Sequence, residues 1–237
     1  LKIMEEKKEE LLTKEAVSVT EETAFTGEQI LTVTKNGRRL YLAGRRDPLA
    51  HPRNQVSVLG RIFANAPVFL LGLGNIHYLE ELAEKADQSA IFLIYEPLFS
   101  VFDKQLERAD FEKIFAGRTV ALIIEGINGD GLEVMTDTML QGDKIPFMKY
   151  FVLPNYVELC KEQVSSFLDI LLKKASHYYV HVGTRMFFSS YQAENFYQNV
   201  QYIPVSYKAF QLFRLIPSDI PAFIVSAGPS LNKNIKQ

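Results

Sequence analysis

The chain has 237 residues, of which 47% are hydrophobic, and a net charge of −2. This length suits one large domain or two modest ones, and a near-neutral charge without long blocks of one sign disfavours nucleic-acid binding. Cys160 is the only cysteine, which excludes an intrachain disulfide and a cysteine zinc cluster and fits a reducing compartment. No apolar run approaches the roughly 20 residues of a membrane span. We therefore expect a soluble, cytoplasmic protein that binds neither nucleic acid nor membranes.

The amino-terminal segment over residues 1–27 is predicted to be a helical arm. Residues 4–15 mix Glu and Lys with two leucines, a composition typical of a solvated helix. Further on, the stretches 30–34 and 39–42 flank the pair Asn36-Gly37, in which both residues tolerate a positive φ. This pattern predicts a β-hairpin at the start of a domain that covers residues 28–155.

The rest of residues 28–155 alternates between apolar strands and helices. The expected strands are 68–71, 90–95, 120–124 and 150–153, and the expected helices are 53–64, 78–85, 98–108 and 132–140. Strands without polar alternation are typical of a sheet that is covered on both faces. The alternation implies an α/β fold, a Rossmann-like parallel sheet with helices on both faces.

Residues 156–217 are predicted to form a helical segment that is unusually aromatic. Its aromatic side chains include Tyr178, Tyr179, Phe187, Phe188, Tyr191, Phe196, Tyr197 and Tyr202. A platform that stacks on bases is one interpretation, but the segment has no basic stripe, so packing between domains or subunits is the better one. A homo-oligomer is one way to bury these rings. His177 and His181 share a helix face at i, i+4, but no third ligand lies nearby in sequence, so we expect no metal site.

A glycine turn follows the first predicted parallel strand. Gly72 and Gly74 come directly after this strand, and Glu96 stands at the tip of the next one. In half-Rossmann units, glycines let the backbone approach a nucleotide, and an acidic residue about 20 positions on binds ribose hydroxyls. His77 occupies the place of the third glycine, where a bulky side chain opposes packing around a pyrophosphate. The three residues are a candidate nucleotide site that suits methionine-adenosyl ligands better than dinucleotides, and a structural role stays open.

The sharpest motif lies in the last predicted segment, residues 218–237. Its apolar run 222–227 has the length of a buried strand, and Gly228, Pro229 and Ser230 follow directly. Glycine allows close backbone approach, proline suits the first turn of a helix, and the serine hydroxyl can cap the helix or bind a phosphate oxygen. The helix dipole would stabilise an anion there. The motif predicts either an anion-binding turn or an ordinary strand-to-helix turn.

Four stretches of the sequence, taken in order, indicate a family. They are Tyr41-Leu42-Ala43-Gly44-Arg45-Arg46-Asp47-Pro48, Val68 through Leu79, Ile94-Tyr95-Glu96-Pro97 with Phe99 and Phe102, and Pro221 through Leu231. Together they resemble the motility-associated factor (Maf) proteins, the bacterial flagellin glycosyltransferases. The last stretch is similar to the first strand and loop of the family's central domain, which is related to 6-hydroxymethylpterin pyrophosphokinase-like (MptE-like) proteins. A similar turn occurs in sialyltransferases that use CMP-sugars. His51-Pro52 departs from the family pattern.

The resemblance implies transfer of a nonulosonic acid, of the pseudaminic or legionaminic type, from its CMP-activated form to Ser or Thr of flagellin. Gly228, Pro229 and Ser230 would cradle the nucleotide phosphate, with no cofactor besides the CMP-sugar substrate and with flagellin as partner. Most of the catalytic domain would follow Gln237, so we expect an amino-terminal fragment that is inactive alone. Two alternatives stay open: an S-adenosylmethionine-dependent, methyltransferase-like enzyme that uses the Gly72 turn, and a non-catalytic interaction module.

Overall fold

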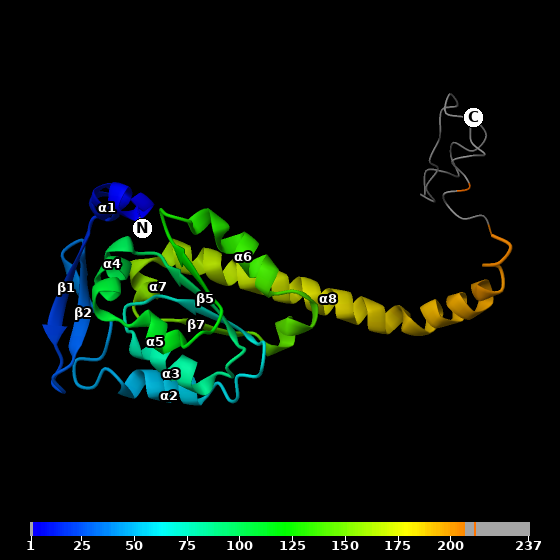
Figure 1. Cartoon of the computed structure of the whole chain (residues 1–237), viewed down its shortest axis with the longest axis horizontal. Helices are drawn as coiled ribbons and strands as arrows, with labels where there is room; N and C mark the ends of the chain where they lie inside the picture. The colour runs from blue at the N-terminus through cyan, green and yellow to red at the C-terminus, as the bar shows by residue number, and fades with distance from the viewer. Residues whose placement is uncertain (1, 207–210, 212–237) are drawn as a thin grey trace, which may run out of the picture. The chain divides into compact units, whose positions relative to one another are not determined.

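The computed structural model describes residues 2–206 and residue 211 of the chain (Figure 1). The predicted turn Gly228-Pro229-Ser230 and its strand lie outside the described residues, and so does most of the predicted helical segment beyond residue 206. A first compact unit ends at Val182 and contains both sheets of the described fold.

An antiparallel sheet of three strands precedes the parallel one. Its strands are β1 (Val17–Thr23), β2 (Gln29–Lys35) and β3 (Arg38–Tyr41), in the order β1-β2-β3. Asn36 and Gly37 have φ values of 53° and 73° between β2 and β3, so two residues with positive φ close the hairpin. The predicted hairpin is confirmed.

The amino-terminal arm is helical only over α1 (Lys2–Glu15). The prediction of a helical arm over residues 1–27 is wrong for its second half, because β1 pairs with β2 along its whole length. Without β1, the hydrogen-bonding groups on that edge of β2 would be unpaired. The Glu15 carboxylate accepts hydrogen bonds from the N–H groups of Phe99 and Ser100 at the start of α4 (Phe99–Arg108), so the end of α1 is tied to the parallel-sheet unit.

The second sheet is parallel throughout, in the order β6-β5-β4-β7. Its strands are β4 (Pro67–Leu71), β5 (Ile91–Glu96), β6 (Val120–Ile124) and β7 (Lys149–Val152). The remaining helices are α2 (Ala50–Ser57), α3 (His77–Lys85), α5 (Phe111–Phe115), α6 (Leu132–Met139), α7 (Tyr156–Leu159) and α8 (Lys161–Val200), with short 3-10 helices at Gly129–Gly131 and Gly142–Phe147. The predicted Rossmann-like α/β class is confirmed.

The helix α2 (Ala50–Ser57) both begins and ends earlier than the predicted range 53–64. The Asp47 carboxylate accepts hydrogen bonds from the N–H groups of Leu49 (2.9 Å) and Ala50 (3.1 Å), which stabilises the helix start. Pro52 then falls in the first turn, where a helix needs no backbone donor, so the proline does not exclude a helix there.

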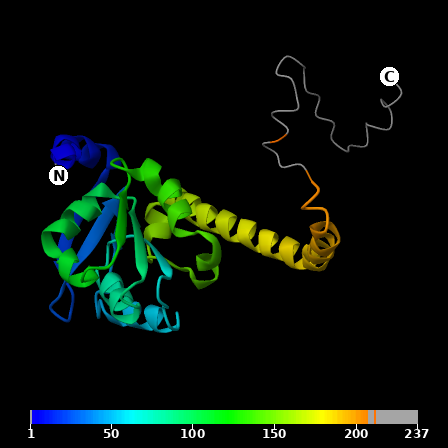
Figure 2. The same ribbon diagram turned by 45° about the vertical axis from the view of Figure 1, so that its right-hand side comes forward.

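Helices cover both faces of the parallel sheet, and β5 shows how. Phe92 points to one face, with its ring centre 5.8 Å from that of Phe115 in α5, whereas Tyr95 points to the other, 6.1 Å from Phe167 in α8. The helix α3 packs with α5, and α6 is linked to α8 by the ion pair Asp137–Lys174. The strands therefore lie between α3 and α5 on one side and α6 and α8 on the other (Figures 1 and 2).

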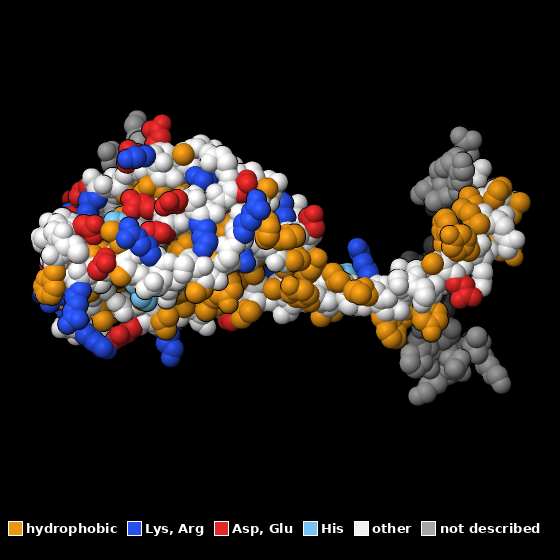
Figure 3. Space-filling model, turned by 90° about the horizontal axis from the view of Figure 1, so that it is seen from below, with side chains coloured by type: hydrophobic (Ala, Val, Ile, Leu, Met, Phe, Trp, Pro, Cys, Tyr) orange, Lys and Arg blue, Asp and Glu red, His pale blue; other side chains and the backbone are white. Residues whose placement is uncertain are grey.

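A second unit begins at Gly183, within α8. All side chains of α8 from this residue to Val200 are exposed, including five of the aromatic ones that mark the segment in sequence. Figure 3 shows hydrophobic side chains gathered along this helix. No helix among the described residues is both long and apolar enough to cross a membrane.

Candidate functional site

Three chain segments meet where β4, β5 and β7 end. The loop after β4 carries Gly72 and Gly74, β5 ends in Glu96, and the chain after β7 leads to Tyr156. The Gly72 N–H donates to the carbonyl of Tyr95 (2.8 Å), which holds the turn against β5. In parallel sheets, ligands bind outside the carboxyl ends of the strands, so this edge is where a nucleotide is expected.

The Glu96 carboxylate lies inside the protein, with 0% of the residue exposed. Its Oε2 accepts hydrogen bonds from the Leu73 N–H (2.6 Å) and the Tyr156 hydroxyl (2.7 Å), and its Oε1 accepts one from the Leu98 N–H (2.8 Å). Three donors thus compensate the loss of water around both oxygens. This carboxylate organises the turn from within and presents no oxygen to a ribose.

The space above the glycines is filled by protein side chains. A methyl group at Gly72 would lie 2.8 Å from the Tyr156 ring, and one at Gly74 would lie 2.4 Å from Cδ1 of Leu42. The Gly74 N–H donates to the Tyr156 hydroxyl at 3.1 Å. The glycines therefore serve close packing of the protein on itself, because only hydrogen fits at either position.

The structure brings the predicted residues Gly72, Gly74 and Glu96 together, but commits their polar groups to internal partners. A nucleotide at this turn would have to displace both Tyr156 and Leu42. Sequence reasoning missed these two residues, since they lie far from the turn along the chain. The predicted nucleotide role of the three residues stays a prediction, and this conformation favours the structural role that the sequence also left open.

The protonation of Glu96 is set mainly by its burial. Loss of water raises the pKa of this carboxyl from its ordinary 4.5 to about 8, and the hydrogen bonds from Tyr156, Leu98 and Leu73 oppose that rise. Burial also raises the pKa of the Tyr156 hydroxyl, and the neighbouring carboxylate raises it further. The tyrosine therefore stays protonated and keeps its hydrogen bond to Glu96.

Stability is expected to fall as the pH rises through the titration range of Glu96. Its pKa is higher in the folded protein, so the folded state binds more protons between pH 4.5 and 8. The free energy of unfolding should drop by up to about 4 kcal/mol between pH 5 and 8. Urea titrations at four pH values measure it. The variant Glu96→Gln should lack this pH dependence. If the free energy of unfolding fell equally with pH in both proteins, the raised pKa could not belong to Glu96.

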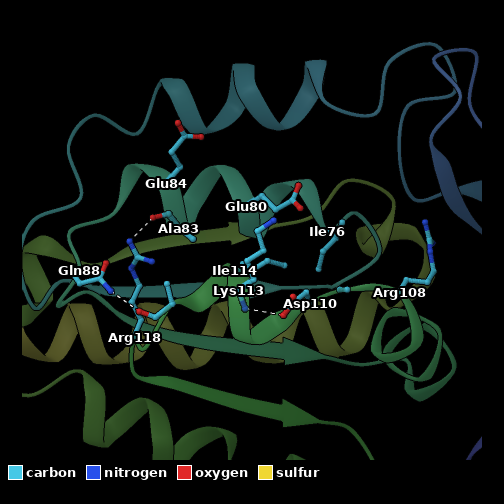
Figure 4. Close-up of a pocket in the computed structure, with 12 residues that line it drawn as sticks. Ile76, Glu80, Ala83, Glu84, Gln88, Arg108, Asp110, Lys113, Ile114 and Arg118 are labelled. Atoms are coloured by element: carbon cyan, nitrogen blue, oxygen red, sulfur yellow. Dashed lines mark hydrogen bonds between the residues drawn. The ribbon is translucent and has the colours of Figure 1, made fainter.

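A hollow between α3 and α5 has a volume of about 720 Å³ (Figure 4). Arg118 crosses it and donates to the carbonyls of Ala83 (2.8 Å) and Ala86 (3.2 Å) at the end of α3, and Gln88 donates to the Ala116 carbonyl (2.7 Å). These side chains tie helix ends together. None of the described site residues Gly72, Gly74 and Glu96 lines this hollow.

The comparisons with known proteins give no family. No protein-family model matches the chain, and no curated protein matches it. Within residues 2–206 and 211, no group of three or more His, Cys, Asp or Glu residues is placed to hold a metal. The rings of His177 and His181 pack against each other, with their centres 5.0 Å apart.

Proposed function

We propose that this chain is the amino-terminal, non-catalytic portion of a flagellin glycosyltransferase. The enzyme would transfer a nonulosonic acid from its CMP-activated form to Ser or Thr of flagellin. The ordered resemblance of four stretches to the Maf family motivates this assignment. Within that enzyme, this chain would serve as a scaffold and as a module for protein contacts.

One observation carries the proposal: three of the four resembling stretches meet in one buried contact network. Leu42, from the first stretch, covers Gly74, from the second, and the Leu73 N–H binds Glu96, from the third. The Asn75 side chain also donates to the Pro48 carbonyl at 3.0 Å, which joins the first two stretches again. The resemblance therefore concerns residues that build one shared interior.

The same network supports a role other than catalysis. A methyltransferase-like enzyme needs a free carboxylate for the ribose and open N–H groups near the glycines. Here Glu96 is fully buried, and the N–H groups of Leu73 and Gly74 have protein acceptors. A sheet edge closed in this way suits a scaffold better than a cofactor site.

The second unit offers a surface for protein contacts. Within the part of α8 that belongs to this unit, the exposed aromatic side chains are Phe187, Phe188, Tyr191, Phe196 and Tyr197. A buried aromatic side chain covers roughly 150–250 Å², so at their observed exposure these five leave on the order of 600 Å² accessible. With about 3.6 residues per turn, these side chains are distributed around α8, and together they give the helix an apolar surface that suits protein contacts. This surface would contact flagellin or another part of the enzyme.

Deleting the gene in the encoding organism tests the function. Intact flagellin, measured by mass spectrometry, should lose the mass of its nonulosonic acid residues, and the wild-type gene should restore it. Restoration should fail or weaken for the double variant Phe196→Ser, Tyr197→Ser. The matched control Val58→Ser, at an 83% exposed residue of the first unit, should restore fully. Flagellin of unchanged mass in the deletion strain would contradict the proposal.

A second experiment tests the non-catalytic role separately. The purified 237-residue chain, incubated with CMP-pseudaminic acid and unmodified flagellin, should yield no glycosylated product. Product formation at a sustained rate would show that this chain itself carries the catalytic site.

A further inference from the structure

A separate hollow lies at the carboxyl edge of the parallel sheet, with a volume of about 330 Å³. Asn75 and Tyr78, which follow β4, form one wall, and Pro154 and Asn155, which follow β7, form another. The chain leaves β4 toward β5, whereas β7 lies on the opposite side of β4. The neighbouring strands β4 and β7 thus mark the point at which the strand order reverses, the usual ligand position in such sheets.

The hollow is separated from the glycine turn by one side chain. Leu42 packs on Gly74 and also lines the hollow, whose surface is mostly apolar. Its volume falls at the lower end of the range for small-molecule sites, which are mainly apolar with a few placed polar groups. The closed turn and the open hollow are therefore neighbours, and a ligand in the hollow leaves the Glu96 network intact.

Most polar side chains around the hollow already have partners and fix its shape. The Tyr78 hydroxyl donates to Oε1 of Gln55 (3.0 Å) and contacts Nδ1 of His51. The Asn75 amide donates to the Pro48 carbonyl, and the Asn155 amide donates to the Tyr41 carbonyl. These groups hold the walls in place and leave little hydrogen-bonding capacity for a ligand.

Arg45 is the exception. Its guanidinium carbon lies 5.1 Å from the ring centre of Tyr41 and 5.5 Å from that of Phe25. Within residues 2–206 and 211, this guanidinium makes no ion pair and no hydrogen bond, and the N–H groups of Ala43 and Gly44 have no acceptor. All three residues line the hollow. The polar groups that the hollow leaves without a partner are therefore all hydrogen-bond donors. One of them, the Arg45 guanidinium, is a permanent cation that lies against an aromatic ring.

We propose that this hollow binds a small organic anion, in which a carboxylate or phosphate monoester is carried on a flat apolar body. The anion pairs with Arg45 and accepts from the free N–H groups, and the apolar body packs between Leu42 and Pro154. Arginine recognises carboxylate and phosphate by the same paired donors, so both acids share this chemistry. The proposal stands on the hollow alone and does not depend on the glycosyltransferase assignment.

Three probes of one shape test it on the full chain: 1-naphthyl phosphate, 1-naphthoate and the neutral 1-naphthol. Naphthyl fluorescence gives the dissociation constants, and ¹H–¹⁵N spectra locate binding through the amide signals of Ala43, Gly44 and Asn155. At least one anion should bind about tenfold or more tightly than 1-naphthol, as expected for a charge-assisted contact. The tighter anion of the two shows whether the site prefers carboxylate or phosphate.

Two neighbouring arginines provide the matched variants. Arg45→Gln should remove the advantage of the anion over 1-naphthol, whereas Arg46→Gln, at an exposed residue outside the hollow, should keep it within about twofold. Ala43→Leu, which fills the hollow but keeps the cation, should weaken all three probes. Equal effects of the two arginine variants, equal affinity for anion and naphthol, or no saturable binding of either anion would each overturn the proposal.

Discussion

Replacing Gly72 by alanine is expected to lower the free energy of unfolding by about 4 kcal/mol. Two costs add here. The residue has a φ of +103°, which is strained for any side chain by about 1–3 kcal/mol. The added methyl group would also lie 2.8 Å from the ring of Tyr156, a fully buried side chain, and overpacking of this kind costs about 1–3 kcal/mol. Urea denaturation measures the sum.

Gly27→Ala is the matched control for this substitution. Gly27 also has a positive φ, +92°, but an added methyl group there has no neighbour within 4 Å. It should therefore show the backbone strain alone, about 1–2 kcal/mol. If both variants lost the same stability, the contact between the glycine turn and Tyr156 would not matter to the fold.

Removing the hydroxyl of Tyr156 is expected to have the next largest effect, about 2–4 kcal/mol. Tyr156→Phe keeps the ring over Gly72 but leaves the Gly74 N–H without its acceptor, and it takes one donor from the buried Glu96. Each buried group left unsatisfied costs about 1–3 kcal/mol. Thermal and urea unfolding measure the loss. Tyr150→Phe, at a half-exposed residue of β7, should change stability little.

The same variant should change the pH dependence of stability. The Tyr156 hydrogen bond lowers the pKa of Glu96, so its removal raises this pKa further, and the loss of stability with rising pH should extend to higher pH. In a double-mutant cycle with Glu96→Gln, the two substitutions should not add. Additive losses would show that the two side chains act independently.

The sequence was most informative where local chemistry decides the structure. Asn36-Gly37 predicted the hairpin because few other residue pairs tolerate two positive φ values in succession. The apolar runs predicted the four parallel strands because a strand covered on both faces has no polar side. The strand β1 escaped prediction, since its side chains are mostly exposed and polar and its pairing with β2 stabilises it.

The candidate site was predictable only in part. The spacing from Gly72 and Gly74 to Glu96 placed these residues at one sheet edge, as the structure confirms. Sequence could not show that the carboxylate points inward, because Tyr156, its partner, follows β7 and reaches the turn only when β7 pairs with β4. Likewise, Leu42 comes from the antiparallel hairpin. The turn resembles a nucleotide-binding turn in its local sequence, but residues that are distant along the chain fill the space above it. No local sequence pattern indicates these long-range contacts.

A calorimetric titration of the chain with S-adenosylmethionine tests the closed glycine turn most directly. Because Tyr156 and Leu42 occupy the space above the turn and Glu96 has no free oxygen, we predict no saturable heat at millimolar ligand. Saturable binding to the wild-type chain that disappears in Gly74→Val would contradict the closed turn and would restore the methyltransferase-like function.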